Sequence, residues 1–142
     1  MLQVFKKKQE RMEKDFKTFN DKVNITPLLK GQEAFDQALV SAKNQLEQDG
    51  TIRRFKLIYE LLWKTLKKIF TFKGISLNNP RDVFRQAYQD GLIGNIEFWF
   101  EVIKKRNLTS HVYSEQYATE IFNFLPKFQK ELSKTINKIK LL

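Results

Sequence analysis

Residues 51–72 read TIRRFKLIYELLWKTLKKIFTF, and this stretch decides the fold class. Its apolar side chains recur at steps of three and four, which places them on one face of a helix. The face is made of Phe55, Tyr59, Leu62, Leu66 and Ile69. The pattern ends at Lys73-Gly74, and glycine is typical of the position just after a helix. We therefore predict a long central helix over about 51–72.

The chain before this helix shows the same helical spacing twice. A first helix is expected to end near Asn24, and its apolar stripe contains Phe5, Met12, Phe16, Phe19 and Val23. Thr26-Pro27 has the residue types of a helix N-cap and a first helical position, so the second helix begins there. We expect it to stop near Asp49-Gly50. Its stripe contains Leu28, Phe35, Leu39, Ala42 and Leu46.

Three further helices are expected after the central one. Asn79-Pro80 begins a short helix that ends near Asp90-Gly91. Asn95 is a suitable N-cap for the next helix. A last helix runs from about Ser114 to the C-terminus, and Pro126 is expected to bend it or shift its register. The apolar stripe of this last helix contains Tyr117, Ile121, Phe128, Leu132, Ile136 and Ile139.

The arrangement of these helices follows from their connections. No segment of useful length alternates apolar and polar residues as a half-buried strand would, so the fold class is all-α. Short connections favour antiparallel neighbours. We predict an up-and-down antiparallel bundle of four to five helices, in one domain that covers 1–142. Residues 1–24 are predicted to be a helical N-terminal extension, which either joins the bundle or docks on a second protomer.

The composition excludes several kinds of site. The chain has no Cys and His111 is its only His, so thiolate ligands are absent and an intrinsic zinc site is not expected. No Gly-rich phosphate loop or nucleophile elbow is present. We expect neither a metal nor another cofactor. The N-terminus has no apolar run long enough for a signal peptide or a membrane span, which predicts a soluble, cytoplasmic protein without a membrane partner.

The chain is strongly basic. It carries 26 Lys and Arg against 16 Asp and Glu, for a net charge of +10. Such a charge raises the local concentration of polyanions, so RNA, nucleotides or an acidic protein are plausible partners. Lys-rich helices are explained equally well as solvated surfaces. Charge alone therefore does not decide the function.

One short segment stands apart because polar and ionisable side chains gather in it. The segment RNLTSHVY contains Arg106, Asn107, His111 and Tyr113 between two apolar stripes. Capping explains the pattern if Asn107 or Ser110 satisfies backbone groups and Tyr113 is half buried. On an ideal helix Arg106 and His111 lie about 140° apart. They meet only if the chain bends at its weak helix formers, or if two protomers join there.

The segment resembles a known family signature. Arg-x4-His-x-Tyr, with Asn after the Arg, is similar to the signature of HEPN domains, and RNLTSHVY is very similar to its form in nucleotidyltransferase substrate-binding proteins. Other pieces occur in the order of that family, and the similarity covers roughly Leu39 to Ile121. These pieces are Ile52-Arg53-Arg54-Phe55, Glu60-Leu61-Leu62-Trp63-Lys64-Thr65-Leu66-Lys67, Pro80-Arg81-Asp82-Val83 and Gly91-Leu92-Ile93. Lys56 departs from the family, in which an acid is usual at that position.

The resemblance implies a bundle that forms a homodimer and is encoded beside a minimal nucleotidyltransferase, the two acting as a toxin-antitoxin pair. We therefore predict a substrate-binding or partner subunit of such an enzyme. The alternative is that the protein is itself a metal-independent endoribonuclease. By position in the motif, Arg106 and His111 are then the catalytic pair and Asn107 orients them. AMP transfer to Tyr113 silences the enzyme.

Other features of the sequence are explained without a function. Glu60 and Lys64 form an ordinary i,i+4 pair, and a Trp on a central helix, such as Trp63, usually belongs to the core. The cluster of Lys64, Lys67 and Lys68 is expected to be a solvated face. A nucleic-acid-binding module that depends on charge alone lacks an identifiable recognition element.

Overall fold

A computed structural model describes residues 17–18 and 22–142. Within these residues the chain is almost entirely helical, and the predicted all-α class is confirmed. The helices are α2 (Thr26–Ser41), α3 (Gln45–Phe72), α4 (Pro80–Gln89), α5 (Ile96–Leu108) and α6 (Glu115–Lys140), with a short 3-10 turn, η1 (Thr109–His111), between the last two.

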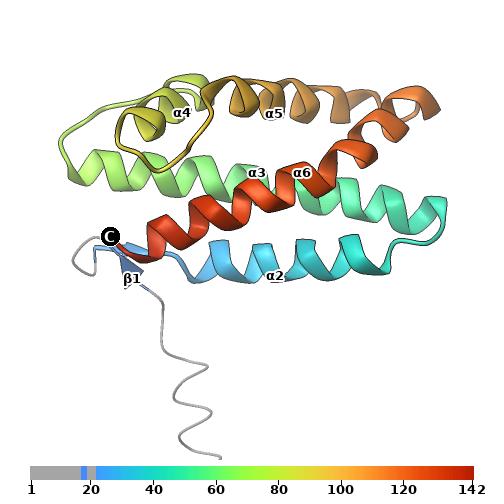
Figure 1. Cartoon of the computed structure of the whole chain (residues 1–142), viewed down its shortest axis with the longest axis horizontal. Coiled ribbons are helices and arrows are strands. Elements are labelled where there is room, and N and C mark those ends of the chain that lie inside the picture. Colours follow the sequence, from blue (N-terminus) through green and yellow to red (C-terminus); the bar gives the residue numbers. More distant parts are fainter. Residues whose placement is uncertain (1–16, 19–21) are drawn as a thin grey trace, which may run out of the picture.

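The long helices run up and down around α3, as predicted. Figure 1 shows α2 and α3 side by side in opposite directions, with α4 and α5 along the other side of α3. The last helix, α6, returns obliquely across the bundle and packs against α2, α3 and α5. The end of α5, η1 and the start of α6 therefore lie together at one end of the bundle.

A cluster of fully buried aromatic rings joins the helices. Phe128 of α6 lies edge-on to Phe35 of α2 at 5.6 Å and to Phe55 of α3 at 4.8 Å between ring centroids. Trp99 of α5 contacts Phe128 at 6.0 Å and stacks on Phe84 of α4 at 5.0 Å. Each buried ring contributes roughly 1.5–3 kcal/mol through removal from water. The core thus fixes the relative positions of all five described helices.

The boundary between α2 and α3 differs from the prediction. We expected a break near Asp49-Gly50, but α2 ends at Ser41 and α3 already begins at Gln45. The side chain of Asn44 accepts a hydrogen bond from the backbone N–H of Glu47 at 2.8 Å, and Glu47 accepts one from the backbone N–H of Lys43 at 3.3 Å. The two contacts form a variant of the capping box, in which the second backbone N–H belongs to Lys43 and not to the N-cap Asn44, and they start α3 before the glycine.

The capping box also corrects the predicted apolar stripe. Leu46 was expected on the buried face of the second helix, but it lies in the first turn of α3 and is 81% exposed. Gly50 lies inside α3, with nothing within 4 Å of the position that its Cβ would occupy. A glycine in a helix costs about 1 kcal/mol relative to alanine, which the rest of this long helix tolerates.

Removal of the cap should weaken the start of α3. Asn44→Ala leaves the backbone N–H of Glu47 without its side-chain partner, and we expect a loss of about 1 kcal/mol in the free energy of unfolding. Urea denaturation followed by circular dichroism measures it. Asn78→Ala is the matched control, because Asn78 is an exposed residue outside the helices. Equal stability of both variants and the parent chain would contradict the assigned cap.

The chain before α2 also differs from the prediction, which placed a helix up to about Asn24. β1 (Lys17–Thr18) pairs antiparallel with β2 (Val23–Asn24). The β-branched Thr18 and Val23 face each other in this ladder, and such residues favour strands over helices. The rest of the predicted first helix lies outside the described residues.

Of the other predicted helix signals, the N-cap assigned to Thr26 is wrong, because Thr26 is the first residue of α2 and Ile25 precedes it without a side-chain cap. The remaining helix ends follow the predicted signals. Asn79 caps α4 by accepting from the backbone N–H of Asp82 at 2.9 Å, and Asn95 caps α5 in the same way at 3.1 Å. Gly74 follows α3 with a φ of 82°, which favours glycine. Pro126 lies inside α6, and the buried face keeps its register across it, because Ile121, Leu125 and Phe128 are all fully buried. Of the two effects expected of Pro126, a bend or a shift of register, the shift does not occur.

No helix in the described part of the chain is long and apolar enough to cross a membrane.

Candidate functional site

The segment 106–113 lies where α5 gives way to α6. The α-helix ends at Leu108, and residues Thr109–His111 form the tighter turn η1 before α6 begins at Glu115. Thr and Ser are weak helix formers, which accounts for the end of α5 at this point. The segment is therefore a helix end and a turn rather than a continuous helix. Its side chains are not held to the spacing of an ideal helix.

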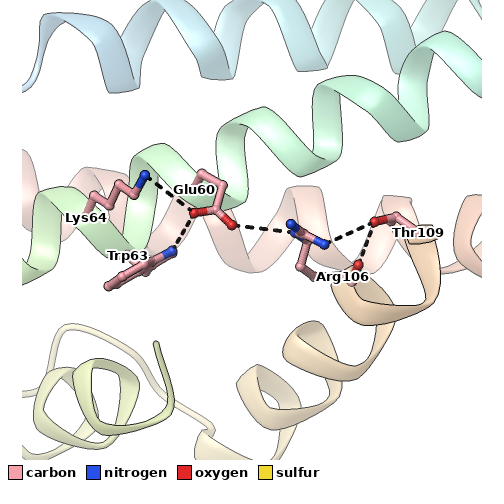
Figure 2. A network of polar contacts seen from close by, with 5 residues as sticks. All are labelled: Glu60, Trp63, Lys64, Arg106 and Thr109. Carbon is pink, nitrogen blue, oxygen red and sulfur yellow. Dashed lines mark hydrogen bonds and ion pairs between the residues drawn. The ribbon is translucent and has the colours of Figure 1, made fainter. Parts of the chain in front are cut away.

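Arg106 points from α5 toward the central helix α3, as Figure 2 shows. Its Nε lies 3.5 Å from Oε1 of Glu60, and its Nη1 lies 3.4 Å from Oγ1 of Thr109. The side chain of Arg106 is 25% exposed, and its Nε is buried without a hydrogen bond of good geometry. The contact with Glu60 is thus an ion pair at the edge of the core. It leaves the guanidinium partly open to the surface.

Glu60 is itself held by its own helix. Its Oε2 accepts a hydrogen bond from Trp63 Nε1 at 2.9 Å and lies 3.8 Å from Lys64 Nζ. These partners are three and four residues further along α3, the spacing at which helical side chains meet. Figure 2 shows that the network continues from Lys64 and Trp63 through Glu60 to Arg106 and Thr109. It joins the centre of α3 to the end of α5.

Capping at this helix end is carried out by residues other than those first considered. Thr109 donates from Oγ1 to the backbone carbonyl of Arg106 at 2.6 Å, and Ser114 accepts from the backbone N–H of Tyr117 at 3.5 Å. Asn107 is exposed, and its side chain makes no hydrogen bond within the described residues. Capping therefore does not account for Asn107.

His111 and Tyr113 form an exposed pair. His111 Nδ1 lies 3.0 Å from the hydroxyl oxygen of Tyr113, and the two rings meet nearly edge-on at 5.8 Å between centroids. The explanation of this segment by capping alone assumed that Tyr113 is half buried. Tyr113 is instead 84% exposed. The pair therefore places an exposed phenol oxygen in contact with an imidazole nitrogen.

Tyr117 also differs from the prediction. We placed it on the buried stripe of the last helix, but it is 39% exposed and its ring lies 6.3 Å from that of His111. Position 117 is in the first turn of α6, and its ring lies beside that of His111 in η1 instead of in the core. His111 therefore lies beside two tyrosines, and of these only Tyr113 has its hydroxyl oxygen within hydrogen-bond distance of the imidazole.

Arg106 and His111 occupy separate networks. Among the described residues, no hydrogen bond, ion pair or ring contact joins the two side chains. Arg106 is anchored on α3, and His111 contacts the tyrosines that follow it. One copy of the chain therefore holds a guanidinium and an imidazole a few residues apart without bringing them into contact.

A comparison with known protein families assigns the chain to one of them. A family model described as nucleotidyltransferase substrate binding protein like matches residues 5–141. The chain belongs to the nucleotidyltransferase substrate-binding family. The match is longer than the stretch from Leu39 to Ile121 on which the resemblance in sequence depended.

Individual proteins are similar to this chain in sequence and fold. The probable ribonuclease HepT of Haemophilus influenzae is 27% identical over 130 residues, which cover 80% of this chain and 89% of that protein. A crystal structure of a Thermus thermophilus protein superposes with a TM-score of 0.73 at 25% identity, over 79% of this chain and 98% of that one.

A second solved structure shows the same fold. It is a Haemophilus influenzae protein that was described as revealing the fold of a substrate binding domain of a nucleotidyltransferase. It superposes with a TM-score of 0.75 at 23% identity, over 82% of this chain and 99% of that one.

In this family member, the residue that our sequence interpretation missed is Glu60. We treated Glu60 and Lys64 as an ordinary helical pair, but Glu60 also carries the ion pair to Arg106. The sequence did contain a signal for this role, because Glu60 is an acid in the middle of the predicted central helix, and an acid at such a position usually needs a partner. The identity of the partner depends on how α5 packs on α3, so the spacing of residues along the chain does not reveal that Glu60 pairs with Arg106.

Tyr59 lies beside the same network but does not belong to the exposed site. Burial raises the pKa of Tyr59 to about 12, the Glu60 carboxylate adds to that rise, and Arg106 opposes it. Tyr59 is 3% exposed. Its phenol is therefore buried and protonated near neutral pH, and Tyr59 is not a candidate for modification by another protein.

Proposed function

We propose that this protein is the substrate-binding or partner subunit of a minimal nucleotidyltransferase encoded nearby, as one half of a two-component toxin-antitoxin pair. The observation that supports this most directly is the exposed Tyr113, whose hydroxyl oxygen lies 3.0 Å from His111 Nδ1. A tyrosine in this position suits a protein that is itself modified by its partner. The family membership supports the same interpretation.

The proposed modification is transfer of AMP from ATP to Tyr113. The phenol proton moves to Nδ1 of a neutral His111, the phenol oxygen attacks the α-phosphorus, and the bond to the pyrophosphate group breaks. The products are a Tyr113 phosphodiester, pyrophosphate and a proton on His111. The nucleotidyltransferase supplies the ATP site. This chain supplies the oxygen nucleophile and the base beside it.

Complex formation with the enzyme encoded beside this gene tests the proposal. We expect a stable complex when the two purified proteins are mixed, measured by size-exclusion chromatography with light scattering. Addition of ATP should raise the intact mass of this chain by one or more AMP units. If the two proteins neither associate nor react with ATP, this function is rejected.

A second function is favoured by one specific observation. A relative that spans most of this chain is named a probable ribonuclease, and Arg106 and His111 are the groups that such chemistry needs. In the proposed reaction His111 takes the 2′-hydroxyl proton and Arg106 stabilises the charge that builds on the phosphate. The 2′-oxygen bonds to the phosphorus and the bond to the 5′-oxygen breaks, so the products are a 2′,3′-cyclic phosphate end and a 5′-hydroxyl end that takes up a proton. AMP on Tyr113, close to His111, would block access of RNA and silence the enzyme.

We also predict a homodimer. Cleavage needs an acid as well as a base, and each chain has a single His, so a two-fold pair that joins two copies of the segment supplies both. The position of the segment at one end of the bundle, with His111 and Tyr113 exposed, permits such a contact. Light scattering at micromolar concentration should give twice the chain mass of 17.0 kDa. A mass of one chain counts against the dimer.

A further inference from the structure

The carboxylate of Glu60 is restrained from two directions. On its own helix, Trp63 Nε1 donates to Oε2 at 2.9 Å and Lys64 Nζ lies 3.8 Å from the same oxygen. Oε1 is turned toward α5, where it lies 3.5 Å from Arg106 Nε. Because the two oxygens have different partners, rotation of the carboxylate would disrupt both contacts. Glu60 is thus a fixed anion that faces the motif arginine, as Figure 2 shows.

The guanidinium of Arg106 is restrained at two of its three nitrogens. Glu60 contacts Nε, and Thr109 Oγ1 lies 3.4 Å from Nη1. Thr109 is held in turn by its 2.6 Å hydrogen bond to the carbonyl oxygen of Arg106. No hydrogen bond or ion pair of Nη2 occurs within the described residues. A guanidinium held in this way still offers N–H donors to a phosphate.

We infer that Glu60 is a positioning residue, which orients the Arg106 guanidinium so that its open edge meets a phosphate of the substrate. The inference rests on the ribonuclease candidate described above. Its physical reason is that a long, flexible side chain stabilises a transition state only if its donors are already placed where the charge develops. Glu60 and Thr109 place them, and Trp63 fixes Glu60.

A purely structural ion pair would behave differently. The Glu60 side chain is 36% exposed, and pairs at such exposure contribute little to stability because solvent screens them. A structural role predicts that loss of Glu60 changes stability and leaves the turnover of each folded molecule unchanged. A positioning role predicts that turnover falls while RNA binding stays equal or becomes tighter, because a negative charge is removed beside the phosphate site.

The test compares Glu60→Gln with Glu131→Gln on single-stranded RNA. Glu131 is a fair control because it is an acid on α6 in an ordinary pair, 3.3 Å from Lys134. We expect kcat of Glu60→Gln to fall at least about tenfold with an equal or lower KM, at an unchanged melting temperature. Trp63→Phe, which removes the donor to Oε2, should lower kcat less. The control should match the parent chain.

A nuclear magnetic resonance measurement separates failure of this inference from failure of the proposed function. The Nε–H resonance of Arg106, assigned from its absence in Arg106→Lys, should exchange slowly with water in the parent chain and in Glu131→Gln. In Glu60→Gln it should exchange fast. If that resonance is unaffected, or if kcat stays at the parent value, Glu60 does not position Arg106. A parent chain that cleaves no RNA rejects the ribonuclease itself, and the resonance still decides whether Glu60 holds Arg106.

Discussion

Tyr113→Phe should lose essentially all transfer of AMP from the partner nucleotidyltransferase, a fall of at least about a hundredfold. The substitution removes the single oxygen that attacks the α-phosphorus and leaves the ring in place. Since Tyr113 is 84% exposed, the fold should not change. Incorporation of label from α-labelled ATP, normalised to folded protein, measures the effect.

Two variants sharpen this prediction. Tyr117→Phe is the matched control, because Tyr117 lies beside the same imidazole at 6.3 Å but makes no hydroxyl contact with it, and it should be labelled like the parent chain. His111→Ala should slow the transfer by about a hundredfold, since it removes the base beside the phenol. Full labelling of Tyr113→Phe would show that another residue accepts AMP.

RNA cleavage by protein free of AMP should fall by about a hundredfold or more in His111→Ala and in Arg106→Ala. The first variant lacks the base for the 2′-hydroxyl proton, and the second lacks the positive charge beside the phosphate. His111 is exposed and the Arg106 side chain is one quarter exposed, so both variants should remain folded by circular dichroism. Denaturing gels with end-labelled RNA measure the rates.

The chemistry of this reaction gives further expected results. Cleavage should persist in EDTA, the products should carry cyclic phosphate ends, and DNA of the same sequence should remain intact because it lacks the 2′-hydroxyl. Asn107→Ala should reduce the rate less than the other two, since Asn107 is proposed only to orient the pair. Cleavage by folded His111→Ala at the parent rate would contradict the mechanism.

Local signals in the sequence predicted most of the helices correctly. The centre of α3 has an apolar face of regular spacing, and Asn79 and Asn95 occupy the capping positions that were assigned to them. The predicted start of α3 was wrong because the apolar spacing of the second helix continues through Leu46, across the true break between Ser41 and Gln45. The Asn44-x-x-Glu47 capping box opposes that spacing, and it is a signal of only four residues.

The site was found from the sequence only in part. On an ideal helix, residues two apart point about 160° from each other, so helical spacing does not predict the contact between His111 and Tyr113. The contact exists because α5 ends at Leu108 and the chain tightens into η1. The ion pair between Glu60 and Arg106 joins two helices that are distant in sequence, and it depends on how α5 packs on α3.

The most direct test of the account is localisation of the AMP group on the unmodified parent sequence. The purified chain is incubated with the neighbouring nucleotidyltransferase and ATP, digested, and its peptides are fragmented in a mass spectrometer. We expect AMP on the peptide that contains RNLTSHVY, with fragment ions that place it on Tyr113. AMP confined to other residues, or none on this chain in a mixture where the enzyme is active, would contradict it.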